Sequence, residues 1–217
     1  MTKKRICRIL LCLMIFALLP VQANAIDRID LSKDVHLTIH FTHEGQPLPG
    51  AHLQIYKVAE ISERGEFAFT AQYAAYPVLL PSEPDWAAIA NTLDAYIQMD
   101  QLQPTDAGVT DENGVVYFPR VRKPMEPGLY LITGDTLTYN DMCFTPVPTL
   151  IALPNREGDS HHWDYDVQVN LKYTFRTAPV DYKVLKTWED DCAEADRPAS
   201  IKINLLKDGQ VIDTVTL

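Results

Sequence analysis

The sequence predicts a mainly-β protein made of β-sandwich domains in tandem, with one short helix in the first domain and a second domain that is cut short. Most of the chain consists of short segments in which apolar and polar residues alternate, which is the pattern of half-buried strands. Fifteen prolines and nine glycines punctuate these segments, as turns separate the strands of a sandwich. One segment breaks this pattern and has the spacing of an amphipathic helix.

The first 25 residues predict a secretory signal peptide. Four basic residues precede an apolar run from Ile9 to Leu19, and the small residues Ala23 and Ala25 form a signal peptidase site. The apolar run is too short to span a membrane. An uncleaved anchor is the alternative, which Pro20 and the cleavage site disfavour. We therefore expect cleavage between Ala25 and Ile26, and a mature chain outside the cytoplasm.

The mature chain is acidic and poor in cysteine. Removal of the signal peptide leaves 15 basic and 29 acidic residues, a net charge of −14. This charge favours solubility and disfavours nucleic acid and anionic lipid as partners. Cys143 and Cys192 remain and fall in different predicted domains. They form either an inter-domain disulfide or, as we favour, two unpaired thiols.

The predicted strands of the first domain follow one another between residues 35 and 169. Each contains β-branched or aromatic residues and is bounded by turn residues. Residues 45–51, rich in glycine and proline, predict a turn after the first strand. The predicted strands are Val35–Phe41, Leu53–Val58, Val115–Phe118, Leu129–Ile132, Thr149–Leu153 and Tyr165–Val169.

Residues 85–99 predict the single helix. Ser82 or Asp85 is available as its N-cap. We expect the helix to cover one edge or mouth of the sandwich, and partner binding is the alternative. Its apolar residues recur at spacings of three and four, namely Trp86, Ile89, Ala90, Leu93, Tyr96 and Ile97.

The chain divides into a signal peptide (1–25), a first domain (26–175), a linker (176–181) and a second domain (182–217). The 36 residues of the second domain cannot close a sandwich of roughly 100 residues. We therefore expect the second domain to be incomplete, and Leu217 not to be the natural end of the protein. Its predicted strands are 182–188, 200–206 and 210–217, and Asp208-Gly209 supplies the hairpin turn between the last two.

The second domain carries an ordered set of short motifs. They are K-x-W-x-D-D at residues 186–191, R-P-x-S-I at 197–201 and L-L-K-D-G at 205–209. With these motifs, residues 182–217 resemble the opening of a Cna B-type domain, a module of collagen-adhesin stalks and pilins of Gram-positive bacteria. The resemblance implies an immunoglobulin-like (prealbumin-like) β-sandwich and a structural role.

The first domain resembles, more loosely, the N-terminal SpaA-like domain of pilins and related surface proteins. Each matching piece is weak alone, but the pieces follow one another in the order that the family shows. They lie at residues 49–58, 110–118, 128–132, 153–154 and 163–167.

The Cna B-type resemblance implies a reactive role for Lys186, which matches the family's isopeptide-forming lysine. A buried lysine loses hydration, so its pKa falls and its amine becomes nucleophilic, while a neighbouring carboxyl polarises the acceptor amide. The family places that carboxyl and the Asn or Asp acceptor on later strands, and Asn204 does not match the acceptor position. We therefore expect no bond within these residues, where Lys186 is otherwise an ordinary strand lysine. The first strand of the first domain lacks a lysine, with Lys33 just ahead of it, so we predict no such bond there either.

The pilin resemblance implies a second lysine of interest. Lys172 stands where pilins carry the lysine that sortase joins to the next subunit, but Asn170-Leu171 replaces the Tyr-Pro of that motif. The L-P-x-T-G sorting signal has only a near miss at residues 153–157. Sortase is thus an expected partner only if downstream sequence carries such a signal.

We predict no catalytic, cofactor or metal site. His161 and His162 are adjacent on an extended segment and would point to opposite faces. The acidic residues between 190 and 196 alternate poorly for calcium, and no nucleophile signature surrounds Cys143.

These observations predict a secreted, non-enzymatic protein that presents β-sandwich domains from the cell wall or cell surface as a stalk or adhesin component. Host extracellular matrix and other surface proteins are candidate partners. The alternatives are a sortase-polymerised pilin subunit and the non-catalytic part of a larger secreted enzyme. The sequence does not identify a ligand, because one fold serves many functions.

Overall fold

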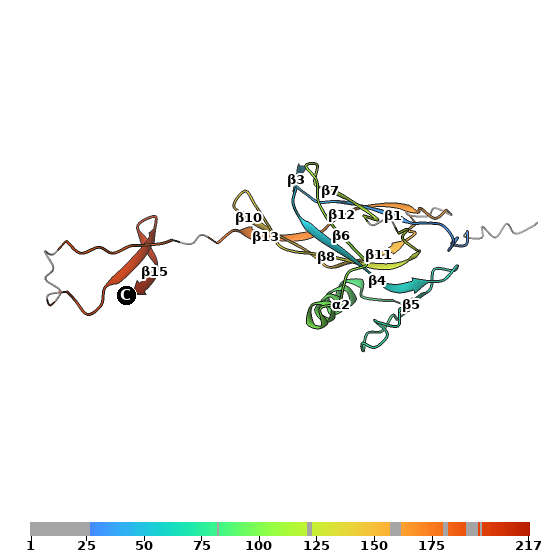
Figure 1. Cartoon of the computed structure of the whole chain (residues 1–217), viewed down its shortest axis with the longest axis horizontal. Coiled ribbons are helices and arrows are strands. Elements are labelled where there is room, and N and C mark those ends of the chain that lie inside the picture. The colour runs from blue at the N-terminus through green and yellow to red at the C-terminus, as the bar shows by residue number, and fades with distance from the viewer. Residues whose placement is uncertain are drawn as a thin grey trace, which may run out of the picture. The chain divides into compact units, whose positions relative to one another are not determined.

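The computed structural model describes residues 27–81, 83–120, 123–156, 162–179, 182–189, 195 and 197–217. The chain divides into two compact units, one reaching to Ala178 and the other running from Pro179 to Leu217. Both units are built from strands, and the first also contains a helix, α2 (Figure 1). The predicted mainly-β architecture with one short helix is confirmed. The signal peptide and its cleavage site at Ala25 and Ile26 lie outside the described residues.

The first unit is a sandwich of two main sheets. Within the first sheet, the central strand is parallel to one neighbour and antiparallel to the other. That sheet has the order β12 (Asp166–Asn170), β1 (His36–His40), β7 (Val115–Phe118). The second has the order β11 (Thr149–Leu153), β8 (Gly128–Gly134), β4 (His52–Ile61), β5 (Phe67–Phe69), with β6 (Asp106–Val109) also paired with β4.

Two smaller groups of strands extend the sandwich. A three-stranded sheet has the order β13 (Tyr173–Thr177), β10 (Met142–Pro146), β9 (Leu137–Tyr139), and β2 (Thr42–His43) pairs with β3 (Gln46–Pro47). The chain passes from one sheet to another between β12 and β13, because β12 pairs with β1 whereas β13 pairs with β10.

A hydrophobic core lies between the two main sheets. The period-two alternation of the strands sends every second side chain into it. β1 confirms the half-buried strand predicted at residues 35–41, whereas β4, predicted as half-buried at 53–58, is buried on both faces. The fully buried members of this core include Leu37 and Ile39 of β1, Leu53 and Ile55 of β4, and Tyr130 and Ile132 of β8.

A second hydrophobic core lies on the outer face of the sheet that contains β4 and β8. There α2 (Trp86–Asp100) packs Ile89, Ala90, Leu93 and Ile97 against the remaining side chains of β4 and β8. The prediction that the helix covers an edge or mouth is therefore wrong, because it lies on a sheet face (Figure 1). The outward side chains of these two strands are themselves apolar and need a cover. They include Tyr56 and Val58 of β4, and Leu129 and Leu131 of β8.

Both ends of α2 have specific caps. The Asp85 side chain accepts a hydrogen bond from the Ala88 amide at 3.0 Å, which confirms Asp85 as the N-cap. At the other end, Gln101 adopts a left-handed conformation that ends the helix. A loop covers the helix, since Tyr76 stacks on Tyr96 with ring centroids 4.3 Å apart and donates a hydrogen bond to Asp100.

Several strands differ from the sequence prediction. β5, β6, β9, β10 and β13 were not predicted, and Arg176 and Thr177, assigned to the linker, belong to β13. The side chains of β13 are mostly exposed, and the strand is held by backbone pairing with β10. Tyr173 and Phe175 alternate with polar residues along β13 and lie against the Phe144 ring of β10. Two apolar residues are too short a pattern to distinguish a strand from a linker.

The second unit contains a β-hairpin. β14 (Lys202–Lys207) pairs with β15 (Gln210–Thr216), and Asp208 and Gly209 both have positive φ angles, as predicted for this turn. The predicted strand at Tyr182–Trp188 is wrong, since these residues form no strand. A strand needs a neighbour for its backbone hydrogen bonds, and in the described part of this unit β14 and β15 pair only with each other.

The second core gives a direct test of the role of α2. We expect Leu93→Ala, at a fully buried position, to lower the free energy of unfolding by about 2–5 kcal/mol, because it leaves a cavity between helix and sheet. Met99→Ala, on the same helix but 67% exposed, should change it by less than about 0.5 kcal/mol. Urea denaturation of residues 26–217 measures both, and equal effects would contradict the packing described here.

Candidate functional sites

Thr110 joins two of the sequence motifs of the first unit. Its hydroxyl donates to the Leu48 carbonyl at 2.7 Å and accepts from the Ala51 amide at 2.9 Å. Its backbone also bonds to Ala51 and Gly50. Because Thr110 is buried, loss of these bonds would leave polar groups unsatisfied. The residues at 49–58 and 110–118 thus hold one another in place.

The turn at 111–114 fixes β7 beside β1. The Asp111 carboxylate accepts from the Asn113 and Val115 amides at 2.9 Å, and the Gly114 carbonyl accepts from the Phe41 amide at 2.8 Å. Gly114 has a φ of +70°, and a Cβ there would lie 2.4 Å from the Phe41 oxygen. Only glycine fits this position, so the motif is structural.

Lys172 lies between β12 and β13, where the chain passes from one sheet to another. The preceding residue, Leu171, is buried and donates to the His40 carbonyl at 2.9 Å. The Lys172 carbonyl accepts from the Val147 amide at 2.8 Å, while its side chain is exposed. The backbone is therefore held from both sides, and the amine is open to solvent.

The paired strands β1 and β12 carry no lysine on their inner faces. Leu37 lies beside Val167, and Ile39 beside Val169, in the parallel register of β1 and β12. These apolar side chains belong to, or pack against, the core. Lys33, ahead of β1, is exposed and places its amine 5.0 Å from the centre of the Tyr165 ring. The absence of an isopeptide bond in this unit stays a prediction.

Lys186 is exposed within the described residues of the second unit. Its amine lies 4.0 Å from the centre of the Trp188 ring and donates to the Thr187 carbonyl. The Asn204 side chain accepts a hydrogen bond from the Thr214 hydroxyl at 2.9 Å. The position of Lys186 therefore lacks the burial that would make its amine nucleophilic.

His162 and Trp163 hold the start of the folded chain. The Nδ1 atom of His162 lies 2.7 Å from the Asp27 carboxylate, and the Trp163 indole donates to the Asp27 carbonyl at 2.6 Å. His161 and the acidic residues at 190–194 and 196 lie outside the described residues. Within the part of the chain that is described, no three histidine, cysteine or carboxylate side chains form a group that could hold a metal ion.

Cys143 is a buried free thiol on β10, with its sulfur 3.6 Å from the Thr138 hydroxyl. Cys192 lies outside the described residues. Whether the two cysteines pair therefore stays open.

The outer face of the β12–β1–β7 sheet contains a hollow of about 450 Å³ that the sequence analysis did not single out. One feature of the sequence points to this face: in the alternating segment 35–41, the outward residues His36, Thr38 and His40 are all polar. The other lining residues come from segments distant in sequence, so only the strand register brings them together.

Residues 182–217 match the family model of the Cna protein B-type domain. This match confirms the resemblance predicted for these residues. No curated protein sequence matches the chain.

Solved pilin structures resemble the chain. The major pilin SpaD from Corynebacterium diphtheriae is 21% identical with a TM-score of 0.44, over 70% of this chain and 32% of that one. The T6 backbone pilin of Streptococcus pyogenes is 18% identical with a TM-score of 0.42, over 67% and 29%. The shaft pilin SpaA from Lactobacillus rhamnosus GG is 15% identical with a TM-score of 0.39, over 67% and 51%.

The chain thus spans about a third to a half of the length of these pilins. At these identities, their binding and assembly properties do not carry over to it. The matching family model indicates no enzyme family. In the described residues, no helix is long and apolar enough to span a membrane.

The reactive role of Lys186 can be tested by intact mass. We expect residues 26–217 to have the mass of their sequence, because the family places the partner carboxyl and the acceptor on later strands. Where a product of the same gene completes the domain, we expect the loss of one ammonia for an Asn acceptor or one water for an Asp acceptor, and Lys186→Ala should abolish that loss. A loss of ammonia or water that survives Lys186→Ala would contradict the assignment, and one from residues 26–178 would show a bond in the first unit.

Proposed function

We propose that the chain is part of a secreted cell-surface protein of a Gram-positive bacterium, in which β-sandwich domains form a stalk that presents a binding surface. The observation that carries this proposal is the Cna protein B-type match of residues 182–217, directly after a β-sandwich unit. Tandem β-sandwich modules of this kind are structural, and the proposed role is non-catalytic.

Two further features support this role. The predicted signal peptide would export the chain, and its mature net charge of −14 would keep it soluble outside the cell. The first unit gains its stability from two hydrophobic cores. Such a domain does not require the formation of a disulfide after export.

N-terminal sequencing of the exported protein tests the proposal. We expect the mature chain to begin at Ile26, and protease treatment of intact cells to release fragments of the first unit. Arg5→Glu together with Arg8→Glu should retain the protein in the cell, because a signal peptide needs its basic start. A protein that stays in the cytoplasm with Met1 intact would refute the surface location.

A second candidate function is that of a polymerising pilin subunit. It is favoured by one observation, the exposed amine of Lys172 on a backbone that is fixed on both sides. A transpeptidation substrate needs an accessible amine in a defined position. The replacement of Tyr-Pro by Asn170-Leu171 is the feature that ranks this function second.

Covalent multimers decide between the two functions. If the chain polymerises, cell-wall extracts should show a ladder that resists boiling in detergent, and Lys172→Arg should abolish it because the guanidinium group is not nucleophilic. Lys33→Arg, at another exposed lysine of the same unit, should leave the ladder unchanged. Absence of a ladder from the unsubstituted protein, with sortase present, would exclude the pilin function.

A further inference from the structure

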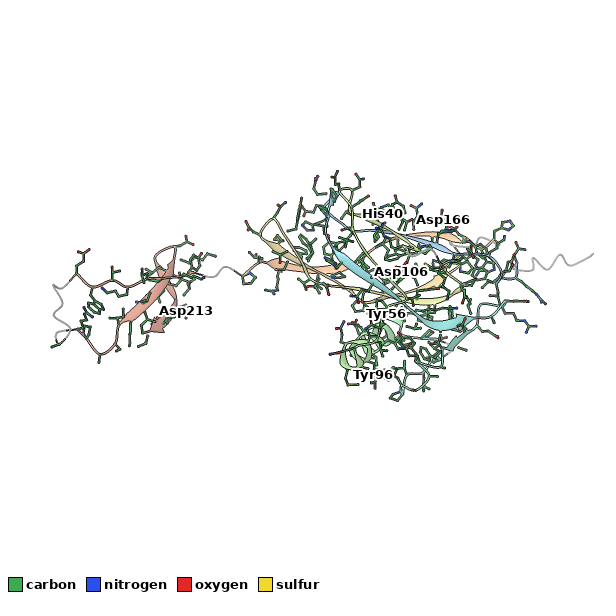
Figure 2. The ribbon with its side chains drawn as sticks, in the orientation of Figure 1. His40, Tyr56, Tyr96, Asp106, Asp166 and Asp213 are labelled. Atoms are coloured by element: carbon green, nitrogen blue, oxygen red, sulfur yellow. The ribbon has the colours of Figure 1, made fainter. Side chains whose placement is uncertain are left out.

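The two main sheets of the first unit have different outer faces. α2 covers the outer face of the sheet that contains β4 and β8, whereas β12, β1 and β7 lie on the opposite side of the unit, with no helix over them (Figure 1). Their outer face carries polar and aromatic side chains from all three strands. His40 and Asp166, labelled in Figure 2, mark this side of the unit.

The strand register brings these side chains together. Tyr117 of β7 pairs with Thr38 of β1, and Thr38 pairs with Gln168 of β12, so that three side chains lie in one row across the sheet. His36 pairs with Asp166 in the neighbouring row.

The face is hollowed rather than flat. The hollow measures about 450 Å³ and is lined by residues of all three strands. Thr38 faces outward but is only 8% exposed, because its neighbours rise around it, while Tyr117 is 57% exposed. Thr38 therefore lies at the floor, and Tyr117 offers an open ring surface.

The hydrogen-bonding capacity of the hollow is unused within the part of the chain that is described. No hydrogen bond or ion pair there involves the side chains of the lining histidines, Thr38, Tyr117, Gln168 or Asp166. Hydroxyl, amide and imidazole groups offer hydrogen-bond donors and acceptors, and a carboxylate adds acceptors. A ligand that fills this hollow must therefore be rich in both kinds of group.

Charge narrows the class of ligand. The lining contains no lysine or arginine, and Asp166 is its one carboxylate. Phosphate, sulfate and acidic sugars would lack a counter-charge there, and the net charge of −14 would repel them. A neutral polyhydroxylated ligand meets no such penalty, and the apolar face of a sugar ring fits an exposed aromatic ring.

We propose that this hollow is a binding site for a neutral carbohydrate. The sugar ring lies on Tyr117, and neighbouring hydroxyl groups bond to Gln168 and Asp166, with the Thr38 hydroxyl at the floor. This inference rests on the proposed function for its biological setting. It adds to that function the class of ligand that the surface presented by the stalk binds.

Ligand-observed saturation-transfer NMR on residues 26–217 tests the site. The probes are the methyl glycosides, in both anomers, of glucose, galactose, mannose, fucose, N-acetylglucosamine and N-acetylgalactosamine, at millimolar concentration. We expect at least one to receive saturation, and N-acetylneuraminic acid, an anionic sugar, to receive none.

Substitutions assign the signal to the hollow. Tyr117→Ala and Gln168→Ala, both at exposed positions, should each weaken binding at least about fivefold, because each removes a direct contact. The matched control is Tyr139→Ala, which removes a tyrosine of β9 that is 36% exposed and lies outside the hollow. It should leave binding unchanged, and thermal unfolding confirms that all variants are folded.

Two results would overturn the site. One is the absence of saturation for all the neutral glycosides, which would leave this face as an ordinary solvated sheet surface. The other is a signal that persists in both Tyr117→Ala and Gln168→Ala, which would place binding elsewhere. The measurement uses purified protein, so it is independent of export. A protein retained in the cytoplasm would refute the proposed function while leaving the site itself to be judged by NMR.

Discussion

The burial of β4 and β8 on both faces is the constraint on which the rest of the first unit depends. Side chains on one face of these strands fill the core of the sandwich, and those on the other face form the core under α2. Each fully buried large apolar side chain contributes about 1.5–3 kcal/mol before the loss of conformational entropy is counted. The helix, its caps and the loop that carries Tyr76 all serve to keep water from the second of these faces.

This constraint also explains why the two sides of the unit differ. One sheet gives its outer face to the helix and gains stability from it. The other sheet does not need that contribution, so the outer positions of β1, β7 and β12 are free to carry polar side chains at little cost to the fold. The Gly114 carbonyl accepts from the Phe41 amide and so holds the start of β7 beside the end of β1, while Thr110 ties the preceding segment to Leu48 and Ala51.

The sequence could predict the elements whose own residues carry a period. The strands at 35–41 and 115–118 and the helix at 85–99 were predicted because their apolar spacing is local. The sequence did not predict where the helix packs, because alternation in a strand does not show whether another element covers its outward residues. In β13, Tyr173 and Phe175 alternate with polar residues, but this pattern is too short to distinguish a strand from a linker. The hollow depends on the register of β1 and β12, whose paired residues His36 and Asp166 are far apart in the sequence, and no local pattern reports such a pairing. For Lys186 the family resemblance implies a reactive role, whereas the geometry shows an exposed amine over Trp188.

The parallel pairing of β1 with β12 has a mechanical consequence. The register joins five residue pairs, from His36 with Asp166 to His40 with Asn170, and the two strands run in the same direction. Tension applied to the chain before β1 and after β12 would pull these strands past each other along their length. All the backbone hydrogen bonds between them would then bear the load together, instead of opening one at a time from an end. The parallel pairing of β1 with β12 therefore opposes extension of the segment that these two strands enclose.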